Sequence, residues 1–325
     1  MKPTISIIIE AYNEEANKLA FHSDTVDALF EQGFPLDRVE LLFIGSPGQL
    51  DHISVEHPEW KAFAAVRQVT VDSKGDHYWQ LKNKAAEMAA GDIVAHADSD
   101  VVPAPTWLRA IVTGIESGAD VTVGPSQFRT SKLPSNSPWM LAAALPTWAF
   151  VLAYSGSGKA PEPNSLLSHN VAMRRDILLR HPYPTFRRSY CSSLLYFDLK
   201  RSGARIVYQP GQRVAHGMTF RWWVRIHFRR GWECYTGREL DPSWPRIRFV
   251  AKMKFVEPVV LRMGLVLRDA RHWFRYARVV GVGGVRAILL WPLVIAAVFT
   301  ARTAEMAGMY AGLTKPQLTK DLARF

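Results

Sequence analysis

Apolar residues in the first 125 positions fall into short runs that alternate with longer, helix-like stretches. The first run, at 5–9, is β-branched and lacks polar alternation, which is typical of a strand buried on both faces of a sheet. We expect strands at 5–9, 39–44, 66–71, 93–97 and 121–123. Strands that alternate with helices predict an α/β fold with a mostly parallel, doubly wound, Rossmann-like sheet.

Two aspartates, Asp98 and Asp100, follow the fourth run, just before Val101-Val102-Pro103, which we expect to end the strand. The carboxyl ends of parallel strands are where open α/β sheets bind ligands. Residues two apart on a strand point to the same side, so these carboxylates are expected to converge. Two like charges held close repel each other unless a cation lies between them. The pattern predicts a site for Mg²⁺ or Mn²⁺, and the alternative is a pair of solvated loop aspartates.

Further segments occur in an order that one enzyme family shares. The strand at 5–9 leads into Tyr12-Asn13-Glu14, and a helical stretch at 78–92 carries Lys-Asn ahead of the acidic pair. Residues 169–178 read His-Asn-Val-Ala-Met-Arg-Arg-Asp-Ile-Leu, and 200–216 hold a late strand and a histidine. Over roughly residues 4–235 this order resembles the family 2 glycosyltransferases, which have the GT-A fold.

The resemblance implies a nucleotide-diphospho-sugar donor and a divalent cofactor, Mn²⁺ or Mg²⁺. It implies that Asp98, Asp100 and His216 hold the metal, although a buried, hydrogen-bonded role for His216 stays open. The donor contacts that it implies are Ala11, Tyr12, Asn13, Glu14, Asn83, Lys84, Asp98, Arg230 and Trp232. Lys84 is equally compatible with a solvated surface lysine, and Arg230 and Trp232 with membrane contact.

The chain departs from the family pattern in three places. Gly45-Ser46 stands where the family has an acidic pair near the nucleobase, and Glu10 replaces a usual Pro. Cys191-Ser192 stands where the family has Glu-Asp with a catalytic base. A serine needs a group that deprotonates it before it can act as a base. The candidates for the missing base are Ser192 acting through water, Asp198, Glu233 and His227.

Composition separates the last third of the chain from the rest. The net charge is +11, and residues 221–286 carry 15 Lys/Arg against 5 Asp/Glu, interleaved with aromatic residues. Such a stretch can bind nucleic acid or an anionic membrane surface. Residues 287–301 are uncharged, but as a helix they span only about 22 Å, less than the roughly 30 Å hydrocarbon core. A half-inserted helix is favoured over a full span or a buried core helix.

These patterns predict three segments: a nucleotide-sugar-binding GT-A half at 1–125, an acceptor half at 126–235 and a membrane-associating tail at 236–325. Two cysteines and no recognisable secretory signal fit a reducing compartment. We expect an inverting, metal-dependent glycosyltransferase at the cytoplasmic face of the cell membrane. Its expected partners are a nucleotide-diphospho-sugar, a sugar or lipid-linked acceptor and the membrane surface, with no nucleic acid. The alternative is a catalytically degenerate GT-A scaffold that binds nucleotide sugars or membrane partners.

Overall fold

The computed structural model describes most of the chain in ranges separated by gaps. These ranges are 4–10, 20–51, 58–71, 78–129, 134–148, 152–153, 162–163, 165–185, 191–237 and 253–314. The predicted donor contacts Ala11, Tyr12, Asn13 and Glu14 lie outside them. The chain forms two compact units, which we call the sheet unit and the helical unit. The sheet unit comprises Met1–Pro134, Val151–Phe186 and Cys191–Gly217, and the helical unit comprises Ser135–Phe150, Arg187–Tyr190 and Met218–Phe325. The three segments expected from the sequence are a functional division and stay a prediction.

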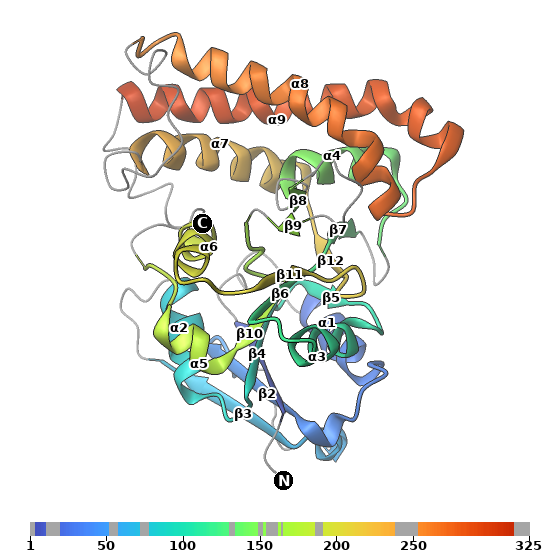
Figure 1. Cartoon of the computed structure of the whole chain (residues 1–325), viewed down its shortest axis with the longest axis vertical. Coiled ribbons are helices and arrows are strands. Elements are labelled where there is room, and N and C mark those ends of the chain that lie inside the picture. Colours follow the sequence, from blue (N-terminus) through green and yellow to red (C-terminus); the bar gives the residue numbers. More distant parts are fainter. Residues whose placement is uncertain are drawn as a thin grey trace. The chain divides into compact units, whose positions relative to one another are not determined.

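A seven-stranded sheet forms the centre of the sheet unit (Figure 1). In spatial order its strands are β11 (Ile206–Tyr208), β6 (Val121–Val123), β10 (Val171–Arg174), β4 (Ile93–Asp98), β1 (Ile5–Glu10), β2 (Val39–Gly45) and β3 (Ala65–Thr70). All neighbours pair in parallel except β10, which is antiparallel to both β4 and β6. The five predicted strands are all present, and the predicted α/β fold class is confirmed.

Helices cover both faces of this sheet, because its central strands are apolar on both sides (Figure 1). One face packs against α1 (Ala20–Phe30) and α3 (Trp107–Glu116). The other packs against α2 (Tyr78–Met88), α5 (Arg175–Arg180) and α6 (Cys191–Arg201). One 3₁₀ turn, Leu36–Arg38, precedes β2, and a second, Pro58–Ala62, lies between β2 and β3. The central strands are thus shielded from water, as in other doubly wound sheets.

A second, three-stranded sheet lies beyond the end of β4. Its strands are β5 (Val101–Pro103), β12 (Val214–Gly217) and β7 (Ser126–Arg129), in the order β5-β12-β7. The prediction that Val101-Val102-Pro103 ends the preceding strand is therefore incomplete. Ser99 and Asp100 form a turn, and the chain then starts a new strand because β12 offers it a partner. The short strands β8 (Leu152–Ala153) and β9 (Glu162–Pro163) pair separately.

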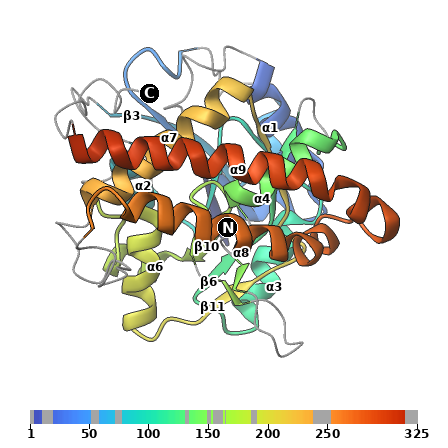
Figure 2. The ribbon, with the colours of Figure 1, turned by 90° about the horizontal axis from the view of Figure 1, so that it is seen from above.

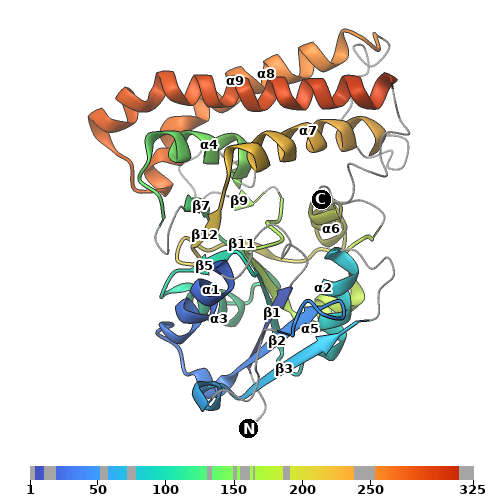
Figure 3. The same ribbon diagram turned by 180° about the vertical axis from the view of Figure 1, so that it is seen from behind.

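The helical unit consists of α4 (Pro138–Trp148), α7 (Phe220–Gly237), α8 (Glu257–Val279) and α9 (Gly284–Thr314) among the described residues. Helix α9 runs alongside α8 (Figure 2) and also packs against α7 and α4 (Figure 3). By length and composition α9 is the only helix in the described ranges that is apolar enough to cross a membrane. One third (33%) of its most apolar window is buried inside the protein.

A charged network is buried between the helices of this unit. Arg302 of α9 lies 2.5 Å from Asp269 of α8 and 2.6 Å from Glu305, and Glu305 also binds Arg262 and His227. Burial lowers the pKa of His227 to about 4, so its imidazole is neutral near pH 7. The network connects helices α7, α8 and α9, and each of its charged groups has a partner of opposite charge.

Two glycines let the backbones of α7 and α9 touch. A Cβ atom at Gly231 would lie 1.8 Å from the carbonyl oxygen of Glu305, and one at Gly308 would lie 1.9 Å from that of Phe228. Neither position has room for a methyl group, since carbonyl oxygens of a packed helix cannot move aside cheaply. Gly264 of α8, in contrast, has nothing within 4 Å of its Cβ position.

We predict that Gly308→Ala lowers the free energy of unfolding by about 1–3 kcal/mol or more, because the helices must separate to accommodate the methyl group. Gly264→Ala is the control and should raise it by about 0.5–1 kcal/mol, because alanine favours a helix over glycine. Thermal and denaturant unfolding of the detergent-solubilised variants measures both. Equal effects of the two substitutions would contradict the close helix contact.

Candidate functional site

The ends of several strands bring polar side chains together beyond the carboxyl edge of the sheet. Asp98 is the last residue of β4, a central strand. Since β10 is antiparallel to β4 and pairs Val171 with His96, the residues just before β10 lie beside Asp98. Strand β12 pairs His216 with Val101, which places its histidine beside the turn that holds Asp100. Strand pairing, rather than proximity in the sequence, therefore builds the site.

Asp98 is almost fully buried and is held by two residues of helix α2. The ammonium group of Lys82 donates to Asp98 Oδ1 at 2.7 Å, and the hydroxyl group of Tyr78 lies 2.9 Å from both carboxylate oxygens. Burial by itself raises the pKa of Asp98, but the adjacent Lys82 together with His169 and His216 outweighs this effect and lowers that pKa. Burial raises the pKa of Tyr78 well above its usual value, so its hydroxyl group stays protonated and donates. Asp98 is therefore a charged, oriented carboxylate.

Asp100 lies beside His216. The Nε2 atom of His216 is 3.6 Å from Asp100 Oδ1, and both side chains are buried. Burial raises the pKa of Asp100, and His216 partly offsets this effect. Nδ1 of His216 is 2.6 Å from the carbonyl oxygen of Gly217, so this nitrogen carries the proton and donates.

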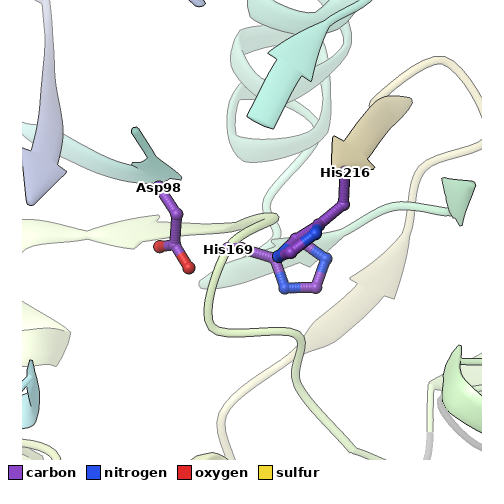
Figure 4. A group of neighbouring side chains, drawn as sticks. All are labelled: Asp98, His169 and His216. Carbon is purple, nitrogen blue, oxygen red and sulfur yellow. The ribbon is translucent and has the colours of Figure 1, made fainter. Parts of the chain in front are cut away.

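Asp98, His169 and His216 form a group that can hold a metal ion. Each offers one ligand atom, and these atoms lie within 4.8 Å of one another (Figure 4). A carboxylate and two imidazoles are a donor set that fits a divalent transition metal. Asp100 does not belong to this mutually close group, although it contacts His216. His169 was not among the candidates from the sequence. The antiparallel pairing of β10 with β4 places His169 beside Asp98, and no local sequence pattern indicates that pairing.

The structure places Lys82, rather than Lys84, against Asp98. Lys82 is fully buried, follows Tyr78 by one helical turn and also donates to the carbonyl oxygen of Ser168 at 2.9 Å. Lys84 is half-buried and lies two residues further, on a different side of the helix. Sequence reasoning missed Lys82, although it falls within the apolar stripe of α2. A lysine in such a stripe is the signal that could have identified it.

Asn83 clamps a backbone segment near the site. Its amide group donates to the carbonyl oxygen of Tyr183 at 2.8 Å, and its own oxygen accepts from the Tyr183 amide at 2.9 Å. The ring of Tyr183 packs against His96 and Trp79. This clamp fixes the position of Tyr183, and a direct donor contact by Asn83 stays a prediction.

The two candidate catalytic residues lie on α6. Ser192 is buried in the first turn of the helix, whereas Asp198 lies almost two turns later. Asp198 Oδ2 is 2.6 Å from Nδ1 of His181, and its Oδ1 is 3.6 Å from Arg201. Asp198 thus lies toward the C-terminal end of α6, away from Ser192, where His181 and Arg201 bind its carboxylate. Neither catalytic assignment is tested by these contacts.

The remaining candidates belong to the helical unit. Arg230 donates to the carbonyl oxygen of Thr147 at 3.0 Å, and Trp232 lies near Gly312 of α9. His227 is enclosed in the buried network, and Glu233 lies 3.7 Å from Arg229. The donor roles of Arg230 and Trp232 stay predictions.

Comparison with known proteins identifies the class of this α/β protein. Glycosyl transferase family 2 matches residues 6–180, more than half of the chain. The chain therefore belongs to glycosyltransferase family 2. It is a nucleotide-sugar transferase, and the family, GT-A fold and enzyme class expected from the sequence are confirmed.

Individual relatives are distant. Glucosyl-dolichyl phosphate glucuronosyltransferase from Haloferax volcanii is 22% identical over 278 residues, which cover 74% of this chain and 79% of that protein. The mannosyltransferase PcManGT from Pyrobaculum calidifontis, solved with GDP-Man and Mn²⁺, aligns with a TM-score of 0.58 at 18% identity and covers 98% of this chain and 89% of that one. S. aureus TarS 1–349 with UDP aligns with a TM-score of 0.48 at 14% identity, covering 96% and 91%.

We predict that Lys82→Met lowers the free energy of unfolding by about 3–5 kcal/mol, because it leaves the buried Asp98 carboxylate without its cation. Lys84→Met is the matched control, with the same change on the same helix, and should cost less than about 1 kcal/mol. Urea unfolding of the full chain measures both. A larger loss for Lys84→Met would mean that Lys82 is not the residue that supports Asp98.

Proposed function

We propose that the chain transfers a sugar from a nucleotide-diphospho-sugar to a hydroxyl acceptor, with inversion, in a metal-dependent reaction. The observation that carries this proposal is the buried group of carboxylates and imidazoles at the carboxyl end of β4. Further support comes from the neighbour PcManGT, whose structure contains GDP-Man and Mn²⁺. The chemistry of the donor set fits such an ion, because carboxylate oxygens and imidazole nitrogens both bind Mn²⁺-like cations.

In the proposed reaction, Asp98, Asp100 and His216 would hold the divalent ion, which would supply positive charge near the departing diphosphate. The residues around it keep these ligands ready: Lys82 and Tyr78 hold Asp98 in one orientation, and the Gly217 carbonyl group fixes the tautomer of His216. Such prior orientation lowers the cost of binding the donor in a reactive geometry.

The acceptor hydroxyl group must lose a proton, and this chain has Cys191-Ser192 where the family has Glu-Asp. We propose that Ser192, acting through water, or Asp198 serves this step. Ser192 is buried in the first turn of α6. Asp198 would first have to release His181. The departure at this position also favours the second candidate function, a GT-A scaffold that binds donors without turnover.

The proposed acceptor is a sugar or a lipid-linked sugar at the cytoplasmic face of the membrane. Support for a lipid comes from the name of the Haloferax relative, which includes glucosyl-dolichyl phosphate. Support for the membrane comes from α8 and α9, which expose a set of large apolar side chains. These are Val260, Leu267, Phe274, Val285, Ile288, Leu289, Trp291 and Phe299, which we call the apolar face. Phe274 and Trp291 stack at 6.5 Å and connect the two helices.

The arrangement of these helices favours a half-inserted unit over a spanning one. Helix α8 packs along α9 but exposes Arg268, Arg271, Arg275 and Arg278, and its composition does not suit a membrane span. A spanning α9 would carry these arginines into the hydrocarbon core, at a cost of about 2.5–3.5 kcal/mol each at the centre. Lying in the interface instead, the arginines reach the lipid headgroups. Basic residues before α9 agree with the cytoplasmic side.

We predict that Asp100→Asn reduces metal-dependent donor binding at least about tenfold, because it removes a charge from the metal site. Binding and hydrolysis of GDP-mannose, UDP-glucose, UDP-N-acetylglucosamine and UDP-glucuronate are measured with Mn²⁺ and with a chelator. Asp176→Asn, at an exposed ion pair on α5, is the control.

Turnover of one donor by the wild type, lost in Asp100→Asn, supports the enzyme. Binding without turnover, when candidate acceptors are present, supports the scaffold. No binding of any donor rejects both.

We predict that the double substitution Ile288→Glu, Leu289→Glu lowers partition into vesicles at least about tenfold, because two side chains that are 62% and 73% exposed lose their apolar burial in lipid. Flotation with phosphatidylcholine–phosphatidylglycerol vesicles measures this effect. Leu179→Glu, at an exposed leucine of the sheet unit, is the control. Substitution is preferable to removal of α9, since α9 packs against the three other helices that the structure describes in its unit, α4, α7 and α8. Unchanged flotation would show that the membrane contact does not involve Ile288 and Leu289.

A further inference from the structure

We infer that the partner of the helical unit is an anionic phospholipid surface, and that the negative charge of the lipids decides whether the chain attaches to a bilayer. This inference rests on the proposed membrane association and specifies the lipid that the association requires. The observation that carries it is a separation of charges within the helical unit. Acidic side chains lie inside the unit, and basic side chains lie on its surface.

Every acidic residue in the described part of the helical unit is buried. These residues are Glu233, Glu257, Asp269 and Glu305, and each is at most 5% exposed. The exposed charged side chains of the same ranges are all basic: Arg221, Arg225, Lys254, Arg268, Arg271, Arg275, Arg278 and Arg286. Since the acids serve the interior, the described surface of this unit presents positive charge without negative charge beside it. A partner that covers this surface must therefore be anionic.

Four of these arginines follow one another along α8. They are Arg268, Arg271, Arg275 and Arg278, which we call the arginine row. Their spacing of three and four residues places them on one side of the helix. Like charges at this spacing repel each other, so the row does not stabilise α8 itself. An external anion would relieve this repulsion.

The arginine row adjoins part of the apolar face. The indole nitrogen of Trp273 donates to the carbonyl oxygen of Ala287 at 2.7 Å, which holds the second half of α8 against the first turns of α9 (Figure 2). Phe274 lies within the row in the sequence and stacks on Trp291 of α9. The first turns of α9 carry three aliphatic side chains that are 70%, 62% and 73% exposed: Val285, Ile288 and Leu289. Cationic and apolar side chains thus lie next to each other on the same pair of helices.

This mixture distinguishes a lipid surface from other anionic partners. A nucleic acid would bind the arginines through its phosphates, but it would leave the aliphatic side chains in water, because its bases stack on aromatic rings. A second copy of this face would set one arginine row against another, and like charges across an interface are unfavourable. An anionic bilayer matches both components, since its headgroup phosphates bind arginine and its acyl chains cover the apolar side chains.

The test is flotation of the full chain with vesicles after removal of detergent. Phosphatidylcholine vesicles are compared with mixtures that contain rising fractions of phosphatidylglycerol or of phosphatidylserine. Partition into the anionic vesicles should be at least about tenfold stronger than into phosphatidylcholine alone, because each basic residue near an anionic surface contributes about fivefold. The two anionic lipids should act alike at equal charge, and added salt should weaken binding to both because it screens the charges.

The double substitution Arg271→Gln, Arg278→Gln removes two charges of the arginine row. It should weaken binding to the anionic vesicles roughly 25-fold and change binding to phosphatidylcholine little. Arg271→Lys, Arg278→Lys keeps both charges and should retain most of the binding. Arg180→Gln, Arg205→Gln makes the same change of charge at two exposed arginines of the sheet unit and is the control.

A second double substitution separates the apolar contribution from the electrostatic one. Ile288→Gln, Leu289→Gln leaves the charge of the chain unchanged and removes apolar contact with the acyl chains. It should weaken binding to neutral and anionic vesicles by the same factor, because apolar burial does not depend on the headgroup charge.

Equal flotation of the wild type with neutral and anionic vesicles, or no flotation with either, would overturn the inference. Unchanged anionic binding of Arg271→Gln, Arg278→Gln would do the same. Duplex DNA that stays bound at a salt concentration that releases the vesicles would assign the surface to nucleic acid instead. Failure of the proposed function has a different signature, in which the chain selects anionic vesicles but neither binds nor turns over any nucleotide sugar. Donor turnover by a chain that ignores lipid charge would keep the function and reject the inference.

Discussion

The buried ion pair between Lys82 and Asp98 is the interaction on which the functional end of the sheet depends. A carboxylate at the end of a central strand is costly to bury unless a cation and hydrogen bonds compensate its charge. Lys82 provides the cation and also binds the carbonyl oxygen of Ser168, the residue before His169. One ammonium group therefore links helix α2, strand β4 and the segment before β10. Strand pairing places Asp98 next to His169, and the Lys82 ammonium group holds the carboxylate and the segment before β10 in that arrangement.

The helical unit combines an exposed apolar face with a well-packed interior. Its helices are joined by the buried network around Arg302 and Glu305 and by the close backbone contact at Gly231 and Gly308. Charged residues thus occupy part of the interior of this unit, and many large apolar side chains lie on the exposed surface of α8 and α9. This distribution suits a unit that rests on a lipid surface, in accordance with the proposed function.

Much of the fold follows from local patterns. The five strands were predictable because β-branched apolar runs between helical stretches have few other stable arrangements, and the Asp98–Asp100 pair was conspicuous in that context. Lys82 was missed because a lysine on a helix is usually exposed. Its place in the apolar stripe of α2 indicates burial, and the packing of α2 on the sheet confirms it. His169 was missed because its place depends on the register between Val171 and His96, 75 residues apart in the chain.

By itself, the sequence determined the family, the doubly wound sheet and the position of the acidic pair, since these depend on hydrophobic periodicity and on motifs in order. It also determined that the last third is basic and apolar. Only the tertiary structure decided which partner each polar group has: Lys82 for Asp98, Ser126 for His169, and β12 for the strand that follows Asp100. The physical reason is that burial and strand pairing are non-local. They arise from segments that meet only after folding, and no short stretch of sequence contains them.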